Sequence, residues 1–327
     1  MKKDLLKVVP AVLAMASICV ACQNDLIDEP VDDEKFSLTV SIPVTETKLT
    51  SSNDDAAINN YQVFLFKDDG TLEDYASQST SDVTLATTIG GKTVVVVVNG
   101  PSLGHVMDFQ TLQNMTMKLS DNSPNSFVFT GSTTIHLSTK ETTAVTVQVF
   151  RKVAKVVLSE LNVVFDVPQF SSQTFKVSSV YLINVSAEMP YLSTTDPTLW
   201  YNKLGYNQED DNSLIYDDMG GQIITPDAPY TTQNTFYCFA NNTKNDSFDL
   251  TWSPRRTRLV VEAMLGDKTY YYPVTLPALE ANKIYQAKLT ITRPGAETPD
   301  SVVDKFNKSF DIVAREWGTI VSVSEDI

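Results

Sequence analysis

The sequence is short of the residues that most often carry catalytic chemistry. Its 327 residues include only two histidines, His105 and His136, which stand in separate segments without the spacing of a metal site. It also contains no nucleophile-elbow pattern, no phosphate-binding glycine loop and no HExxH motif. We therefore expect a protein that is not an enzyme and that needs no cofactor and no metal.

Cysteine is equally scarce. Two of the three cysteines lie within the first 22 residues, which leaves Cys238 alone in the rest of the chain. An intramolecular disulfide is therefore excluded there, and a large hydrophobic core has to supply the stability. Because Cys238 lies in the apolar run "TFYCFA", we expect it to be a small buried hydrophobic residue.

Positive charge is in deficit. The chain carries 25 lysines and arginines against 40 acidic residues, a formal net charge of −15. The excess of acidic residues persists in residues 49–327, which hold 20 basic and 32 acidic residues. This sign argues against nucleic acid and against anionic membrane surfaces as partners.

Long apolar runs are missing except at the start. Basic residues precede an apolar stretch over residues 8–20, which is too short to span a bilayer comfortably. Small residues then lead to "CVAC", which is similar to a bacterial lipobox with Cys22 as the lipidated residue. The alternative is an ordinary secretory signal with an incidental cysteine. The acidic stretch that follows Cys22 cannot bury enough surface to fold alone, so we expect a tether.

Helical periodicity is weak, and most of the chain is typical of β-strands. Residues 90–100, "GGKTVVVVVNG", predict a strand buried on both faces, and Asp69-Gly70 predicts a hairpin turn. Only residues 102–119 favour a short helix. One set of strands ends near Arg151 and another begins there, and residues 189–230 are expected to form an elaborated loop region. The pattern indicates an all-β protein, and the chain length favours two domains.

A strand-like segment stands where a tether would be expected. In "KFSLTVSIPVTETKLTSS", four apolar side chains alternate with polar ones, which predicts a strand with one core face: Phe36, Leu38, Val40 and Ile42. A polar, turn-forming stretch follows and contains Lys48, in the kind of exposed loop where proteases cut.

The end of the sequence carries a second alternating pattern. The apolar side of this segment is formed by Trp317, Thr319, Val321, Val323 and Ile327, and Glu325 interrupts it. A strand with an apolar face has to pair with something. It could close its own domain, or it could add to an exposed edge of a neighbouring molecule.

These segments together give the chain a family resemblance. Their order and spacing resemble the fimbrillins, the major-type (type V) pilin subunits of Bacteroidales, over nearly the whole length. The segments that carry the resemblance are the lipoprotein signal, "KFSLTVSIP", "INNYQVFLFKDDGTLEDY", "GGKTVVVVVNG", "FRKVAKVVL", "LPALEANKIYQAKLTITRPG" and "SFDIVAREWGTIVSVSEDI". The resemblance implies two transthyretin-like β-sandwich domains and a structural role in a fimbria.

The resemblance also implies a mechanism of assembly. A trypsin-like protease outside the cell would cut between Lys48 and Leu49 and release the strand that carries Phe36, Leu38, Val40 and Ile42. A donor segment of another subunit would fill the groove through Thr319, Val321, Val323 and Ile327. The implied division of the chain is a signal peptide over 1–22, a propeptide over 23–48, an N-terminal sandwich over 49–150 and a C-terminal sandwich over 151–327.

The implied location is the cell surface. The precursor would be an outer-membrane lipoprotein, held through the lipid on Cys22 before processing, and would become part of an extracellular fimbrium. The expected partners are other pilin subunits, the processing protease, anchor and tip subunits, and ligands on host or bacterial surfaces. Two alternatives stay open: a surface lipoprotein that binds glycan or host protein without polymerising, and a tip or anchor subunit of the same pilus.

Overall fold

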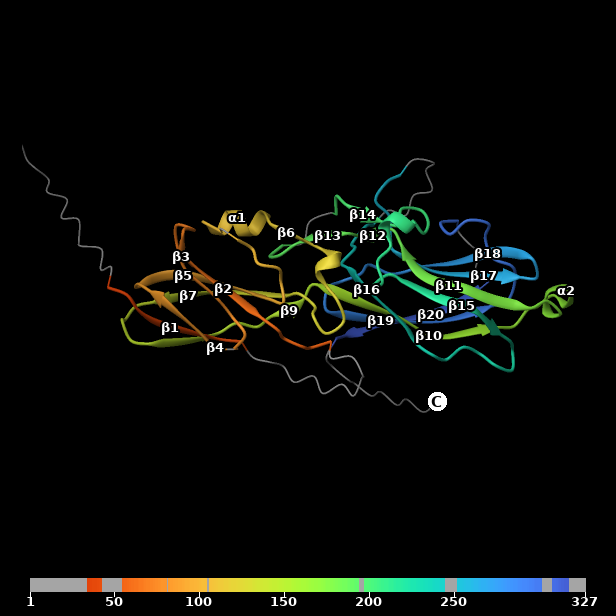
Figure 1. The fold of residues 1–327 in the computed structure, drawn as a ribbon, viewed down its shortest axis with the longest axis horizontal. Coiled ribbons are helices and arrows are strands. Elements are labelled where there is room, and N and C mark those ends of the chain that lie inside the picture. The colour runs from red at the N-terminus through yellow and green to blue at the C-terminus, as the bar shows by residue number, and fades with distance from the viewer. Residues whose placement is uncertain are drawn as a thin grey trace, which may run out of the picture. The chain divides into compact units, whose positions relative to one another are not determined.

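The computed structural model describes residues 34–42, 55–80, 82–104, 106–193, 197–244, 252–301 and 308–317. Strands dominate this part of the chain, so the predicted all-β class is confirmed (Figure 1). Within the described ranges, no helix is long and apolar enough to cross a membrane. Cys22, Lys48, Leu49 and the predicted donor residues after Trp317 lie outside the described residues, as does His105.

The first group of strands forms two sheets. One sheet has the order β4-β1-β8 and contains β1 (Phe36–Ser41), β4 (Asp82–Thr87) and β8 (Thr143–Thr146). The other has the order β3-β2-β5-β7-β9 and contains β2 (Tyr61–Lys67), β3 (Leu72–Gln78), β5 (Gly90–Val98), β7 (Phe129–Leu137) and β9 (Phe150–Arg151). We call these two sheets the N-terminal sheet pair.

The second group also forms two sheets. One sheet has the order β16-β10-β19-β20 and contains β10 (Val153–Val163), β16 (Asn234–Phe239), β19 (Lys283–Ile291) and β20 (Lys308–Glu316). The other has the order β15-β11-β17-β18 and contains β11 (Phe175–Ile183), β15 (Tyr216–Ile224), β17 (Arg258–Leu265) and β18 (Lys268–Thr275). We call these the C-terminal sheet pair.

Short elements complete the fold. Helix α1 (Phe109–Asn114) lies where the sequence predicted a short helix, and the Thr111 amide donates to its N-cap residue Asp108. The remaining elements are α2 (Pro168–Ser171), the 3₁₀ turns η1 (Leu119–Asp121) and η2 (Gln208–Asp210), and the strands β6 (Thr116–Lys118), β12 (Val185–Ser186), β13 (Glu188–Pro190) and β14 (Trp200–Tyr201). β6 pairs with β13 in a separate two-stranded sheet, which joins the segment after α1 to the segment after β12.

The strongest sequence signals correspond to the observed strands. All five residues of Val94–Val98 in β5 are fully buried, as expected for a strand covered on both faces. The β2–β3 hairpin turns at Asp69-Gly70, where Gly70 has φ +82° and its amide donates to the Lys67 carbonyl. Cys238 is fully buried, and burial raises its pKa to about 12, which makes the thiol inert.

One region differs from the prediction. The sequence predicted an elaborated loop over residues 189–230, but β15 occupies Tyr216–Ile224 and pairs with β11. This strand is mostly exposed, its pairing shifts register between Val177 and Ser179, and its Gly220 and Gly221 have positive φ. An exposed, bulged edge strand has no alternating apolar pattern, so its sequence looks like a loop.

The chain passes from one sheet pair to the other over very few residues. β9 pairs with β7 in the N-terminal sheet pair, and β10 begins two residues after Arg151. Between them the Lys152 amide donates to the Val128 carbonyl. Most of the buried apolar residues form one cluster that extends through both sheet pairs, so the division into domains at residue 150 stays a prediction.

Candidate functional site: the first strand and the junction beside it

Strand β1 lies between two other strands. It pairs antiparallel with β4 over Phe36–Ser41 and parallel with β8 over Leu38–Ser41. β4 and β8 are neighbours only through β1 in this sheet. Without β1, each would lose a ladder of backbone hydrogen bonds along one edge. We call the space that β1 occupies the slot.

The side chains of β1 reach the core. Leu38 and Val40 are fully buried, Ile42 is nearly so, and Phe36 is half-buried against the same cluster. The predicted alternation is thus present in the packing. Each fully buried aliphatic side chain is worth roughly 1.5–3 kcal/mol. Removal of β1 would therefore expose a costly apolar groove.

The two ends of β1 are held differently from its middle. At its start, Glu34 forms an ion pair of 2.6 Å with Lys140, and both side chains are exposed. At its end, the Val147 amide donates to the Ser41 carbonyl at 3.0 Å. Exposed ion pairs contribute at most about 1 kcal/mol, so burial and the ladder hold the strand.

The chain that follows the predicted cleavage point re-enters the described structure at Asp55. This carboxylate pairs with Lys155 Nζ at 2.7 Å and accepts a hydrogen bond from the Tyr237 hydroxyl at 3.1 Å. Its backbone carbonyl accepts from Arg151 Nε at 3.0 Å. Burial and the nearby Asp55 carboxylate raise the pKa of Tyr237. Asp55 thus fixes this segment where the two sheet pairs meet.

Trp317 lies at the same junction. It is 4% exposed, and its ring packs against Phe127 and Tyr237 with centroid distances of 5.8 Å each. The Arg151 guanidinium lies 4.7 Å from the Trp317 ring centroid, and Lys155 Nζ lies 5.5 Å from it. The predicted donor segment begins two residues further along the chain, at Thr319, outside the described residues.

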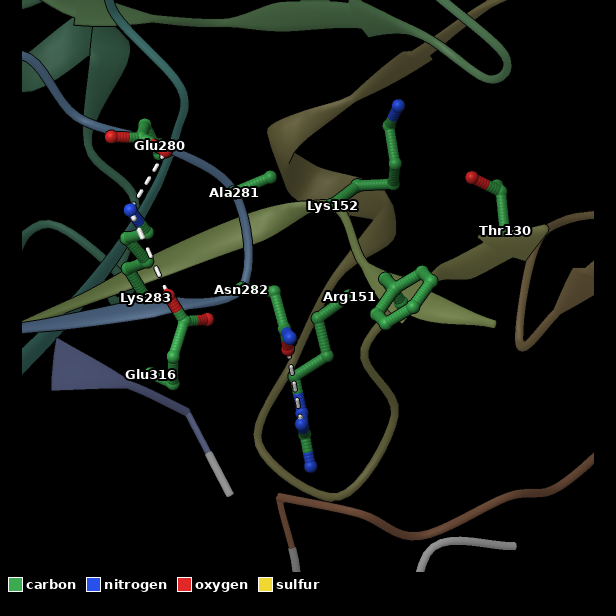
Figure 2. A pocket seen from close by; sticks show the side chains of 9 residues that line it. Thr130, Arg151, Lys152, Glu280, Ala281, Asn282, Lys283 and Glu316 are labelled. Atoms are coloured by element: carbon green, nitrogen blue, oxygen red, sulfur yellow. Dashed lines mark hydrogen bonds and ion pairs between the residues drawn. The ribbon is translucent and has the colours of Figure 1, made fainter. Parts of the chain in front are cut away.

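A pocket of about 400 Å³ opens beside this junction (Figure 2). It is lined by residues from both sheet pairs, namely Thr130, Phe150, Arg151, Lys152, Glu280, Ala281, Asn282, Lys283 and Glu316. Figure 2 shows the Arg151 and Lys152 side chains leaving the strand in opposite directions, with Arg151 turned toward Asn282.

Most charges around the pocket are already paired. Lys283 Nζ lies 2.8 Å from a Glu280 carboxylate oxygen and 3.7 Å from a Glu316 one, and Arg151 donates to Asn282 Oδ1 at 3.3 Å. Lys152 differs, because its ammonium has neither an ion pair nor a hydrogen bond in the described part of the chain. Burial lowers the pKa of Lys152 to about 8.

The structure places only part of the predicted site. The four apolar residues of β1 lie together in the core, while Cys22, the Lys48-Leu49 bond and the donor residues stand outside the described ranges. Sequence reasoning did not single out Asp55, because its partners come from distant segments, nor Lys152, because distant segments line the pocket that it shares. The only signal for Trp317 was that it shares the alternation of the donor segment.

Other residues with reactive side chains do not gather into a site. His136 is exposed on β7, and no group of three histidine, cysteine or acidic side chains suited to a metal occurs among the described residues. Tyr272 is fully buried while Tyr270 and Tyr271 are half-buried. Because successive residues of a strand point to opposite faces, these three consecutive tyrosines form no single flat platform.

One protein-family model matches the first part of the chain. The family model of the major fimbrial subunit protein, FimA, matches residues 36–167. This range begins at β1 and includes every strand of the N-terminal sheet pair. No curated protein matches the sequence.

Solved structures show the same fold over most of the chain. A candidate cell adhesion protein from Bacteroides eggerthii has 19% identity and a TM-score of 0.67, with 87% of this chain and 96% of that chain covered. A fimbrilin, FimA, from Porphyromonas gingivalis has 15% identity and a TM-score of 0.60, with 86% and 97% covered. The tip fimbrial protein Mfa3 of Porphyromonas gingivalis, truncated at its C-terminus, has 11% identity, a TM-score of 0.55 and coverages of 87% and 100%. The predicted resemblance to the fimbrillins is confirmed, by family match for residues 36–167 and by fold for the longer range.

Proposed function

With residues 36–167 in the major fimbrial subunit family and the described chain in the fimbrillin fold, we propose that this protein is a structural, non-enzymatic subunit of a cell-surface fimbria that supports adhesion. It is exported as a lipoprotein with an acylated, palmitate-bearing Cys22 and is held at the outer membrane until it is processed. A trypsin-like protease cuts between Lys48 and Leu49, and the subunits then polymerise by donor-strand exchange.

The position of β1 carries this proposal. β1 is the first described strand, yet it lies inside a sheet, between β4 and β8. It is joined to the rest of the fold through the residues between Ile42 and Asp55, so a single cut in that connection frees it from the other strands.

The driving force is the repair of the slot. Loss of β1 leaves unpaired backbone groups on β4 and β8 and uncovers the apolar residues that Leu38 and Val40 contact. A strand from another subunit with alternating apolar residues would restore both the ladder and the burial. In the proposed fibre that strand contains Thr319, Val321, Val323 and Ile327. No nucleotide is required for such an assembly.

The first test of this function is limited proteolysis of the purified precursor. Trypsin at a limiting dose should give one early product that begins at Leu49, and fibres should then appear by electron microscopy. Lys48→Gln should block both events, while Lys67→Gln, which changes an exposed lysine of β2, should block neither. An early product with another N-terminus would show that the processing site is wrong.

The second test removes the donor. A chain without residues 318–327 should fold as a monomer, be cut normally and form no fibres. If this truncated chain unfolds instead, the segment belongs to its own subunit and the protein is better described as a surface lipoprotein that does not polymerise. A natural protein that stays uncut with a lipid on Cys22 would be an anchor subunit.

A further inference from the structure

The slot has a direction, and its two ends differ in charge. β1 runs parallel to β8, and β8 continues through Val147 to β9 and Lys152. Arg151 is four residues beyond Val147, at most about 14 Å along an extended chain. The end of the slot toward which β1 runs therefore lies within about 14 Å of Arg151, and Arg151 and Lys152 line the pocket. The opposite end, where β1 starts, is close to Lys140.

The donor segment also has a direction. Three small or apolar residues, Thr319, Val321 and Val323, alternate before the pattern reaches Glu325. The slot has three nearly or fully buried positions, those of Leu38, Val40 and Ile42. A carboxylate in any of these positions would be buried without a partner, which costs several kcal/mol. Glu325 must therefore lie outside these three positions.

We infer that residues 319–327 of a second copy enter the slot in the same direction as β1, so that Glu325 and Asp326 lie at the pocket beside Arg151 and Lys152. This inference rests on the proposed strand exchange and adds its polarity and register. Val323 then takes the position of Ile42, Val321 that of Val40 and Thr319 that of Leu38. Glu325 and Asp326 extend two and three residues past the last core position, about 7–10 Å.

Charge and space at this end suit a carboxylate. The pocket of about 400 Å³ can hold an acidic side chain, and the Lys152 ammonium there has no ion pair in the described part of the chain. Burial lowers the Lys152 pKa to about 8, so the buried ammonium is under a desolvation penalty that a carboxylate would relieve. Lys283, by contrast, is already paired with Glu280 and Glu316.

The opposite direction fits less well. With the donor reversed, Thr319 would take the position of Ile42 and Glu325 that of Phe36. Phe36 packs half-buried against the core, so a carboxylate there would face apolar side chains. Lys140 lies near this end, and its partner Glu34 would leave with β1. In the reversed direction Glu325 could therefore pair with Lys140, and the experiment has to distinguish this pair from the one with Lys152.

Engineered disulfides in the full precursor distinguish the two directions. In the proposed direction Ser322 takes the place of Ser41, which pairs with Asp82, so Ser322→Cys with Asp82→Cys should join successive subunits after trypsin treatment. In the reversed direction Ser324 takes the place of Ser37, which pairs with Ala86, so Ser324→Cys with Ala86→Cys should join them instead. Cys238 does not compete, because it is fully buried.

The outcomes are separable from those of the proposed function. Dimers and ladders on a non-reducing gel with the first pair alone support the inference. Ladders with the second pair alone, or with neither pair while wild-type subunits still form fibres, overturn it. If cleaved wild-type subunits form no fibres at all, the proposed function itself fails.

A double-mutant cycle tests the charge contact. Lys152→Met in the acceptor and Glu325→Gln with Asp326→Asn in the donor should each slow assembly about tenfold, and all changes together should slow it no further. Lys140→Met is the matched control, and its effect should simply add to that of the donor changes. A coupling of the donor changes with Lys140 rather than Lys152 would overturn the inference. The melting temperature of each uncut variant separates a folding defect from slower assembly.

Discussion

Strands β1 and β10 hold equivalent places in their two sheets but are attached very differently. Each has an antiparallel neighbour on one side and a parallel neighbour on the other: β4 and β8 for β1, β16 and β19 for β10. Leu38 and Leu158 are both fully buried. β1 and β10 are therefore similar both in their hydrogen-bond ladders and in having a buried apolar face.

What differs is how the ends are secured. The start of β10 follows β9 directly, and its Lys155 pairs with Asp55 and lies over the Trp317 ring. The start of β1 has the exposed Glu34–Lys140 pair, and its end leads to a connection that carries the predicted cleavage site. In the proposed mechanism, a buried strand is therefore removable because of its covalent connections and not because of weaker packing.

The largest expected effect comes from a charge placed at equivalent points of the two strands. Leu158→Asp should prevent folding, because an unpaired buried carboxylate costs at least about 4 kcal/mol. Leu38→Asp should destabilise the precursor without preventing folding, because it alters only the one strand that is removed later. The cut protein should still form fibres and should exchange strands faster, because the altered β1 leaves. Circular dichroism of the uncut and the cut protein measures folding, and electron microscopy of the cut protein shows whether fibres form. Equal loss of fibres with both variants would contradict the comparison.

Removal of the Trp317 ring should have the next largest effect. Trp317→Ala should lower the free energy of unfolding by about 3 kcal/mol, since a fully packed indole leaves a cavity beside Phe127 and Tyr237. Trp317→Phe should recover about half of this loss. Urea denaturation followed by far-ultraviolet circular dichroism gives the values. A change below about 0.5 kcal/mol would show that Trp317 does not secure the junction.

Loss of the Asp55 ion pair should lower the free energy of unfolding by less than loss of the Trp317 ring does, but by a measurable amount. Asp55→Asn should destabilise the subunit by about 1–3 kcal/mol, because it leaves the Lys155 ammonium without its carboxylate. The loss should persist after cleavage at Lys48, since Asp55 remains in the mature chain. Thermal melts of cut and uncut protein test this. Asp69→Asn is a suitable control, because Asp69 sits in an exposed turn without an ion pair to the core.

Lys152, next to β10, should make the stability of the subunit depend on pH. Its pKa is about 8 in the folded chain and near 10.5 when unfolded, so the unfolded chain binds more protons between these values. Stability should therefore rise with pH from about 8 to about 10. Lys152→Met should stabilise the subunit by about 1–2 kcal/mol at pH 7 and lose this advantage near pH 10. A pH-independent difference would contradict the assignment.

The smallest effect is expected at the start of β1. Lys140→Gln should change the stability of the precursor by less than about 0.5 kcal/mol, because its pair with Glu34 is exposed. A similar change at Lys155, by contrast, should cost more than 1 kcal/mol, since that pair is largely buried. Parallel melts in low and high salt test both. Equal losses of stability at Lys140 and Lys155 would contradict the claim that β1 and β10 are secured differently.

The sequence predicted the parts of the fold in which local pattern and packing agree. The β1 alternation, the valine run of β5 and the Asp69-Gly70 turn each need only their own residues to be recognised. β15 was missed because it is an exposed, bulged edge strand whose residues lack a buried face. Its partner β11 carries the apolar side chains, and that pairing is not visible in the sequence of β15 alone.

The contacts at the junction between the sheet pairs could not be predicted from the sequence, for a different reason. Asp55, Lys155, Tyr237 and Trp317 are separated by up to 262 positions, and each taken singly looks like an ordinary polar or aromatic residue of a strand. Lys152 stands in "FRKVAKVV", where it resembles a solvent-facing residue of a strand. Residues 280–283, which line the same pocket, are far from it in the sequence.

By itself, the sequence determined the strand content, the four apolar residues of β1, the lysine that follows them and the order of segments that resembles the fimbrillins. These features follow from side-chain periodicity, which is local. Only the tertiary structure decided that β1 lies between β4 and β8, that it runs parallel to β8, and that Trp317 and Asp55 share one junction. Those facts depend on which distant strands pair, and pairing is settled by the burial of the whole core.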